Sequence, residues 1–145
     1  MSKSNAFETA LLGLIFENTA IANVGDAAGL RASTAAGSLF FSLHTADPGE
    51  AGDQTTSEVA YTSYARTAVA RSAAGWTVTG NASAVDANVA FVAGTGGSGT
   101  ATHWGLGTVV SGAGLLMYKG AISPSIVCGN GVTPQLTAGN VVTED

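Results

Sequence analysis

Charged residues and cysteine are both scarce in this sequence. Asp, Glu, Lys and Arg make up 10% of its 145 residues, compared with about 25% in an average soluble domain. The one cysteine, Cys128, cannot form a disulfide within the chain, so the fold does not depend on such bonds. We expect Cys128 to be a small buried side chain; an intermolecular bridge or a reactive thiol is the alternative. A surface this poor in charge favours coverage by other protein, because soluble monomers normally rely on surface charge to stay apart.

Basic patches and long apolar runs are also missing. The net charge is −5, and the five Lys and Arg residues are scattered along the chain. Nucleic-acid binding needs a basic surface, so it is not expected. A membrane span needs about 20 consecutive apolar residues, and none is present. Polar Ser4 and Asn5 follow Lys3 where a secretory signal would have an apolar core, so no secretory signal is expected either.

The motifs of common catalytic and metal sites are absent. There is no Gly-x-Ser-x-Gly, His-Glu-x-x-His or Cys-x-x-Cys. The glycine-rich stretch 94–99 lacks the Gly-Lys-Ser/Thr ending of a phosphate-binding loop, so we interpret it as a hairpin loop. His44 and His103 are far apart, and we interpret them as a polar strand-end residue and a packed or interface residue. We therefore expect no enzyme activity, no cofactor and no metal site.

An N-terminal amphipathic helix is the clearest local prediction, over residues 4–20. Ser4 or Asn5 can cap this helix, and Glu8 occupies the capping-box position relative to Asn5. We expect the apolar stripe to form a buried contact, either with the sheet of the same chain or with a neighbouring subunit. The stripe consists of Phe7, Leu11, Leu14 and Ile15, widened by Leu12 and Phe16.

The rest of the chain has the pattern of short antiparallel strands. Residues 38–44 alternate, with Leu39, Phe41 and Leu43 expected to point into the core and Ser42 and His44 away from it. Later strands are expected at 76–79 and 83–86 around the Gly-Asn turn 80–81, then at 88–93, 101–109, 115–122 and 140–143. Short strands separated by Gly, Asn and Ser turns indicate a mainly β fold, an antiparallel jelly-roll-like sandwich. The predicted organisation is one compact domain, with a helix and connector at 1–37 and the β-sandwich at 38–145.

An acidic loop separates the strand at 38–44 from a returning strand that carries two arginines. The loop holds Asp47, Glu50 and Asp53, and the returning strand holds Arg66 and Arg71. A buried arginine needs a carboxylate or carbonyl partner, so we expect Arg66 and Arg71 to pin the loop through ion pairs, also counting Glu58 among the candidates. A salt bridge to a partner subunit is the alternative. The loop lacks the ligand spacing of an EF-hand, so we interpret it as a solvated loop; an irregular cation site is the alternative.

Residues 38–145 resemble a family of small virion proteins of tailed bacteriophages, the head decoration, cement and tail-associated proteins. The resemblance rests on Ser-Leu-Phe-Phe-Ser-Leu-His-Thr-Ala-Asp-Pro-Gly-Glu-Ala-Gly at 38–52, then on Tyr61, Tyr64, Arg66, Arg71, Gly75-Trp76, Thr102-His103-Trp104-Gly105, Gly131-Val-Thr-Pro134 and Ala138-Gly139-Asn140. Among these proteins, the chain is most similar to the capsid cement protein of short-tailed phages.

The resemblance implies a structural role without catalytic residues. Such a protein would sit on the outer surface of the capsid in the virion, self-associate as a homodimer, and bridge capsomers of the major capsid protein. The alternative is a tail or fibre-associated adhesin that binds a cell-surface glycan. In that case the aromatic side chains of Tyr61, Tyr64 and Trp76 would stack on sugar rings.

Overall fold

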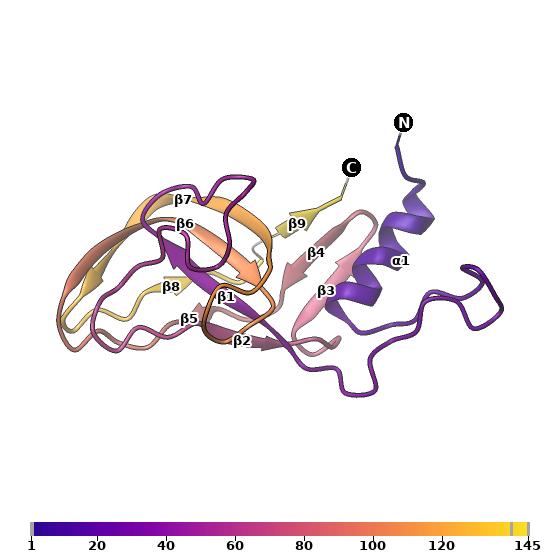
Figure 1. Ribbon diagram of the computed structural model, residues 1–145, viewed down its shortest axis with the longest axis horizontal. Coiled ribbons are helices and arrows are strands. Elements are labelled where there is room, and N and C mark those ends of the chain that lie inside the picture. The colour runs from indigo at the N-terminus through magenta and orange to yellow at the C-terminus, as the bar shows by residue number, and fades with distance from the viewer. Residues whose placement is uncertain (1, 140, 145) are drawn as a thin grey trace. The chain divides into compact units, whose positions relative to one another are not determined.

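The computed structural model describes residues 2–139 and 141–144 of the chain, with one helix and nine strands among them (Figure 1). The predicted class is confirmed: the fold is mainly β, with antiparallel sheets and one short N-terminal helix. The chain divides into two compact units. Unit 1 comprises the residues up to 38, residues 70–88 and those from 137 onward, and unit 2 comprises residues 39–69 and 89–136. The expectation of a single domain divided at residue 37 remains a prediction.

Unit 1 begins with helix α1 (Asn5–Phe16). As predicted, Ser4 caps it: the Ser4 hydroxyl accepts a hydrogen bond from the main-chain N–H of Phe7 at 3.4 Å. The helix ends at Phe16 rather than at residue 20, because Asn18 takes a left-handed backbone conformation with φ 57°. No helix in the described part of the chain is long and apolar enough to cross a membrane.

A three-stranded sheet completes unit 1, with strand order β3-β4-β9. The predicted Gly80-Asn81 turn joins β3 (Trp76–Thr79) and β4 (Ala82–Val85), which pair from Trp76↔Val85 to Thr79↔Ala82. Strand β9 (Val141–Thr143) pairs with β4, whereas Asn140, part of the predicted last strand, lies outside the described residues.

The core of unit 1 lies between α1 and this sheet. Leu12 and Phe16 are fully buried, and the Phe16 ring lies 4.6 Å from the ring of Trp76, centroid to centroid. Val85 and Val142 complete this apolar cluster on the strands. Burial of such side chains stabilises the fold by about 1.5–3 kcal/mol each.

Unit 2 is built on a four-stranded sheet with strand order β2-β1-β6-β7. Its strands are β1 (Ser38–His44), β2 (Thr67–Ala70), β6 (Ser98–Gly107) and β7 (Leu116–Gly129). A two-stranded ribbon pairs β5 (Val89–Ala90) with β8 (Gln135–Leu136). Strands β6 and β7 form a long hairpin, so the strand predicted at 115–122 continues seven residues further.

Strand β1 is central and buried on both faces. Leu39, Phe41 and Leu43 point into the core as predicted, with at most 5% of each side chain exposed. Ser42 and His44, predicted to face away from the core, are also fully buried. The prediction of one buried face is therefore wrong. Period-two alternation of side chains shows which residues share a face, but it does not show whether a second layer covers the other face.

Candidate functional site

A polar cluster of unit 2 consists of Arg66, Glu58 and Tyr64. Arg66 Nε and Nη2 donate to the two carboxylate oxygens of Glu58 at 2.7 and 2.8 Å, and Nη1 donates to the carbonyl of Val109 at 3.0 Å. The Tyr64 hydroxyl donates to Glu58 at 2.8 Å and accepts from the main-chain N–H of Leu43 at 3.0 Å. The cluster therefore ties the segment 58–66 to β1 and to the end of β6.

The electrostatics of this cluster indicate a structural role. Hydrogen bonding to Glu58 raises the pKa of Arg66, and burial raises the pKa of the Tyr64 hydroxyl far above its usual value. A proton donor or acceptor in catalysis needs a pKa near the working pH, and both shifts move away from that range. A small hollow of about 160 Å³ lies beside the cluster, lined in part by Val110 and Gly112.

Arg71 serves a different purpose, in unit 1. Its guanidinium donates to the carbonyl oxygens of Leu14 and Ile15, each at 2.7 Å, and to that of Ala36 at 3.0 Å. Carbonyls in the last turn of a helix lack partners within the helix and carry partial negative charge. Arg71 thus caps the end of α1 instead of pinning the acidic loop.

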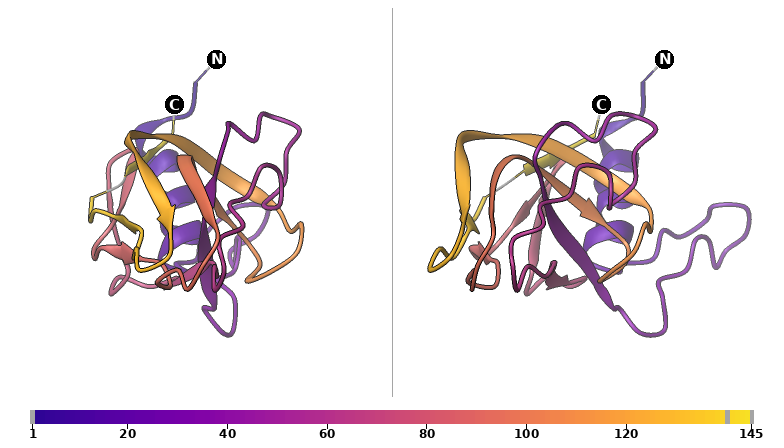
Figure 2. Two further views of the ribbon diagram at one scale, coloured as in Figure 1. Left: turned by 90° about the vertical axis from the view of Figure 1, so that its left-hand side faces the viewer. Right: turned by 60° about the vertical axis from the view of Figure 1, so that its left-hand side comes forward.

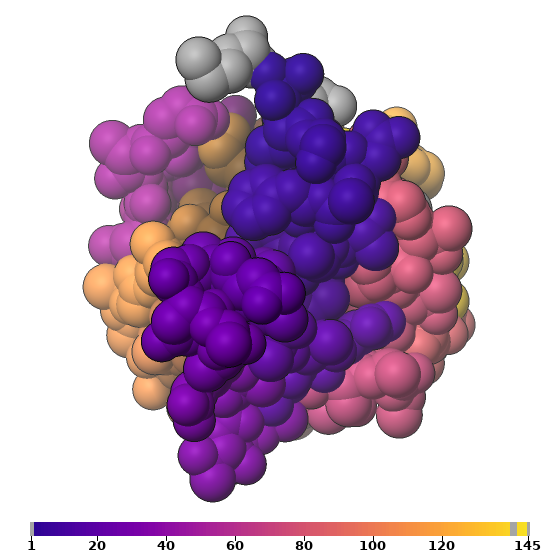
Figure 3. Space-filling view, turned by 90° about the vertical axis from the view of Figure 1, so that its right-hand side faces the viewer, coloured from indigo at the N-terminus to yellow at the C-terminus, as the bar shows by residue number. Residues whose placement is uncertain are grey.

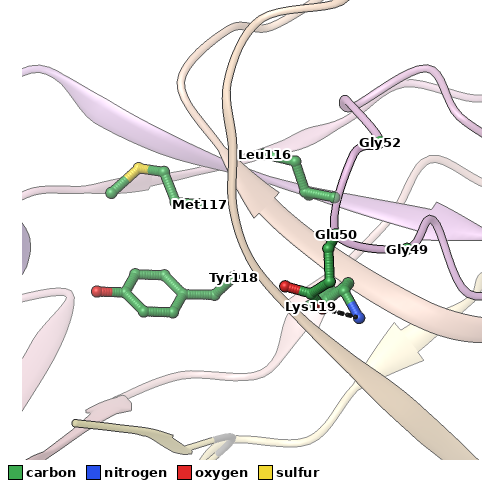
Figure 4. A pocket seen from close by; sticks show the side chains of 7 residues that line it. All are labelled: Gly49, Glu50, Gly52, Leu116, Met117, Tyr118 and Lys119. Atoms are coloured by element: carbon green, nitrogen blue, oxygen red, sulfur yellow. Dashed lines mark ion pairs between the residues drawn. The ribbon is translucent and has the colours of Figure 1, made fainter.

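The acidic loop is held by Lys119 on β7. Lys119 Nζ lies 3.0 Å from Asp47 and 3.2 Å from Glu50. The Gly49 N–H and then Lys119 lower the pKa of Asp47, and hydrogen bonding to Asp47 and Glu50 raises that of Lys119. A groove of about 290 Å³ runs between this loop and β7. Figure 4 shows Glu50 facing Lys119 across the groove, with the Tyr118 ring pointing away.

The third acidic residue, Asp53, is used within its own loop. Its Oδ1 accepts hydrogen bonds from the N–H and the hydroxyl of Thr55 at 2.7 and 2.6 Å. These hydrogen bonds from Thr55 are the main cause that lowers the pKa of Asp53. The next residue, Gln54, is fully buried, and its Oε1 accepts from the N–H of Val109 at 3.0 Å. Of the predicted ion pairs, the one between Arg66 and Glu58 is confirmed. Pairing of Arg66 or Arg71 with Asp47, Glu50 or Asp53 is wrong, because Arg71 binds main-chain carbonyls and Lys119 binds Asp47 and Glu50.

Ser42 and His44 form a hydrogen-bonded pair inside the sheet. His44 Nδ1 lies 2.8 Å from the carbonyl of Thr56, which can only accept, so Nδ1 carries the proton and Nε2 accepts from Ser42 Oγ at 2.8 Å. Burial lowers the pKa of His44. The pair has the atoms of a serine nucleophile and its base, but both side chains are fully buried, so a substrate cannot reach them.

The aromatic side chains proposed to stack on sugars do not form a platform. Tyr61 is 2% exposed, and Trp76 is 1% exposed and belongs to the core of unit 1. Tyr64 is partly buried, packs beside Tyr61 and Phe91, and uses its hydroxyl internally. The glycan interpretation of these three residues is therefore wrong. Cys128 is buried as expected, and burial raises the pKa of its thiol.

Helix α1 buries a different set of residues from the predicted stripe. Glu8, Leu12, Gly13 and Phe16 face the unit's own sheet. The outer stripe, which we define as Phe7, Leu11, Leu14 and Ile15, lies roughly a third of a turn around the helix. Phe7 is 42% exposed and the other three are partly exposed. Figure 3 shows this helix at the surface of the molecule. The prediction that the stripe packs on the chain's own sheet is thus confirmed only for its widening residues, Leu12 and Phe16. For the outer stripe, contact with a neighbouring subunit stays a prediction.

Two residues of these clusters are not identified from the sequence in their actual roles: Lys119 and Gln54. Lys119 is the only basic residue after Arg71, which marks it as a partner for the acidic loop. The histidine, cysteine and acidic residues of the described chain form no group of three or more that could hold a metal ion.

Comparison with known proteins identifies the family. The model of the family described as podophage GP4 fiber I protein gp80 matches residues 2–144. No curated protein matches the chain. Because the match extends over almost the entire sequence, the chain belongs to the podophage GP4 fiber I protein gp80 family and is a structural protein of a bacteriophage virion.

Proposed function

We propose that this chain is a structural subunit of a virion fibre and that it works by assembling with other copies of itself rather than by catalysis. The observation that carries the proposal is the family match over residues 2–144, because that family is described by a fibre protein. This supports the fibre-associated alternative better than the capsid-cement interpretation. Decoration of the capsid surface and bridging of the major capsid protein are accordingly not part of the proposal.

The chemistry of the polar clusters supports a structural role. Three polar interactions join separate segments of the chain: the ion pair of Arg66 with Glu58, the hydrogen bonds of Arg71 to the end of α1, and the ion pairs of Lys119 with the acidic loop. The hydrogen-bonded Ser42 and His44 side chains are fully buried. These polar groups make hydrogen bonds and ion pairs that stabilise the fold, as expected of a structural subunit.

The surface composition supports assembly. With 10% charged residues, much of the surface is neutral, and several large apolar side chains are exposed, among them Phe7, Val24 and Leu30 at 42% each. Where such side chains gather into one patch, they mark contact with other protein.

Quantitative gel densitometry of fractionated virions tests the proposal. Virions are sheared to release fibres and tails, and this chain is measured in the released fraction and in the emptied heads against the major capsid protein. The proposal predicts a substoichiometric amount that leaves with the fibres. An amount near that of the major capsid protein, retained on the heads, would instead establish the cement function.

A further inference from the structure

The outer stripe of α1 is an apolar surface without charge. Phe7 is 42% exposed, and Leu11, Leu14 and Ile15 are partly exposed. Glu8 is the only charged residue of α1, and its side chain is buried against the unit's own strands. A helix that is apolar on nearly all sides is normally covered on all sides. The stripe therefore needs a covering element.

A second uncovered apolar element follows directly in the chain. We call residues 18–36 the arm. Every residue of the arm is at least partly exposed, including the apolar Ile21 and, at 42% each, Val24 and Leu30. Figures 1 and 2 show the arm projecting away from the helix and strands of unit 1. A connection of this length is unusually long and is commonly functional.

The arm has a defined form. At its base, Asn18 and Ser33 exchange two hydrogen bonds, at 2.8 and 2.9 Å. Further out, Ile21 and Leu30 exchange main-chain hydrogen bonds at 2.9 and 2.8 Å. Asp26 Oδ1 closes the tip by accepting from the N–H groups of Ala28 and Gly29. A pre-organised arm loses less conformational entropy on binding than a disordered one.

We infer that the arm of one copy packs on the outer stripe of α1 of a second copy. The inference rests on the proposed fibre function, which brings many copies together. Charge supports this occupant: the arm carries Asp26 and Arg31, which cancel, and the stripe carries no charge. The contact therefore brings no like charges together, and Asp26 keeps its two main-chain hydrogen bonds at the tip of the arm. Arg71 holds the base of the arm, through Ser33 and Ala36, at the end of its own helix, while the stripe of that helix stays partly exposed.

The geometry of such a contact suits a fibre. The two surfaces differ and lie on the same chain, so each copy offers an arm to one neighbour and a stripe to another. A contact of this heterologous kind repeats from copy to copy, giving a closed ring or an open filament. A symmetric contact between two α1 helices would stop at a dimer.

Sedimentation of the purified full chain tests the inference with two variants. Phe7→Asp places a charge on the stripe in the first turn of α1, where an acidic residue favours the helix, so folding is preserved. Val24→Asp combined with Leu30→Asp places charges on the arm. We expect the wild-type chain to form species larger than dimers and each variant to associate at least tenfold more weakly. Val127→Asp, at a valine 67% exposed in unit 2, is the matched control and should assemble as the wild type does.

Mixing the two variants gives the decisive result. The Phe7→Asp chain keeps an intact arm and the arm variant keeps an intact stripe, so an equimolar mixture should form a 1:1 complex that grows no further. Absence of this complex, a wild-type chain that stays monomeric at the highest concentration, or undiminished assembly of either variant would overturn the inference. The densitometry of virion fractions is independent of this result, so the fibre function can stand if the arm contact fails.

Discussion

The guanidinium group of Arg66 and the carboxylate of Glu58 form a two-point ion pair, with both nitrogen–oxygen distances below 3 Å. Only 3% of the Arg66 side chain and 16% of the Glu58 side chain are exposed. In a chain with so few charges, this buried pair determines how the segment after the acidic loop returns to the sheet.

Replacing Arg66 with Met should destabilise the protein by about 3–5 kcal/mol, because it leaves the carboxylate of Glu58 largely buried and without its cation. Arg66→Lys should recover only part of this loss, since an ammonium group cannot bind both carboxylate oxygens and Val109 in the same planar geometry. Urea denaturation measures the free energy of unfolding of both variants. Glu50→Gln, at an ion pair whose Glu50 side chain is 95% exposed, is the control and should leave the midpoint unchanged. Equal midpoints for Arg66→Met and the wild type would contradict the role of the pair.

Replacing Arg71 with Met should loosen the end of α1 by about 2 kcal/mol, because the carbonyls of Leu14 and Ile15 lose a charged donor. Hydrogen exchange resolves the effect by position. Amides in the last turn of α1 should exchange faster, whereas amides of β1 in unit 2 should be unaffected. Faster exchange in both units would instead indicate general destabilisation.

The stability of the protein should fall as the pH drops below about 6.5, the usual pKa of histidine. Burial lowers the pKa of His44 in the folded state, so the unfolded chain takes up a proton at a higher pH than the folded one. The contribution of His44 to the free energy of unfolding is then constant above this pH and declines below it, by at most about 1.4 kcal/mol per pH unit. Denaturation curves between pH 7.5 and 5 measure the slope. His44→Gln should remove most of it, and an unchanged slope in that variant would refute the assignment to His44.

Gly105→Ala should lower the melting temperature by roughly 3–10 °C, from an overpacking cost of about 1–3 kcal/mol. A Cβ at this position would lie 2.6 Å from His44 Nε2 and 2.7 Å from Ser42 Oγ. Gly99→Ala in the same strand is the control, because no neighbouring atom lies within 4 Å of a Cβ there. Calorimetry of both variants should show a lower melting temperature for Gly105→Ala alone. Equal melting temperatures would show that the Ser42 and His44 side chains move aside at little cost in free energy.

The parts of the fold that the sequence predicts are those set by neighbouring residues. The cap at Ser4, the turn at Gly80-Asn81 and the inward face of residues 38–44 all depend on residues a few positions apart. The sequence does not mark the end of the helix, because the left-handed residue there is Asn18 rather than a glycine.

The pairing of charges could not be predicted, because it depends on long-range folding. Arg71 meets carbonyls 56 and 57 residues away in sequence, and carbonyl acceptors occur at every residue, so no side chain marks them. Likewise, the apolar pattern of α1 fits two stripes, and only the position of the strands decides that Leu12 and Phe16, rather than Phe7 and Leu11, are buried.

Immunogold labelling of intact virions tests the central claim, that this chain is a fibre subunit, most directly. Antibodies against the purified chain, with virions of an unrelated phage as the control, show where the protein lies by electron microscopy. We expect gold particles along the fibres and a bare head surface. Gold distributed evenly over the head, with unlabelled fibres, would contradict it and return the protein to the capsid.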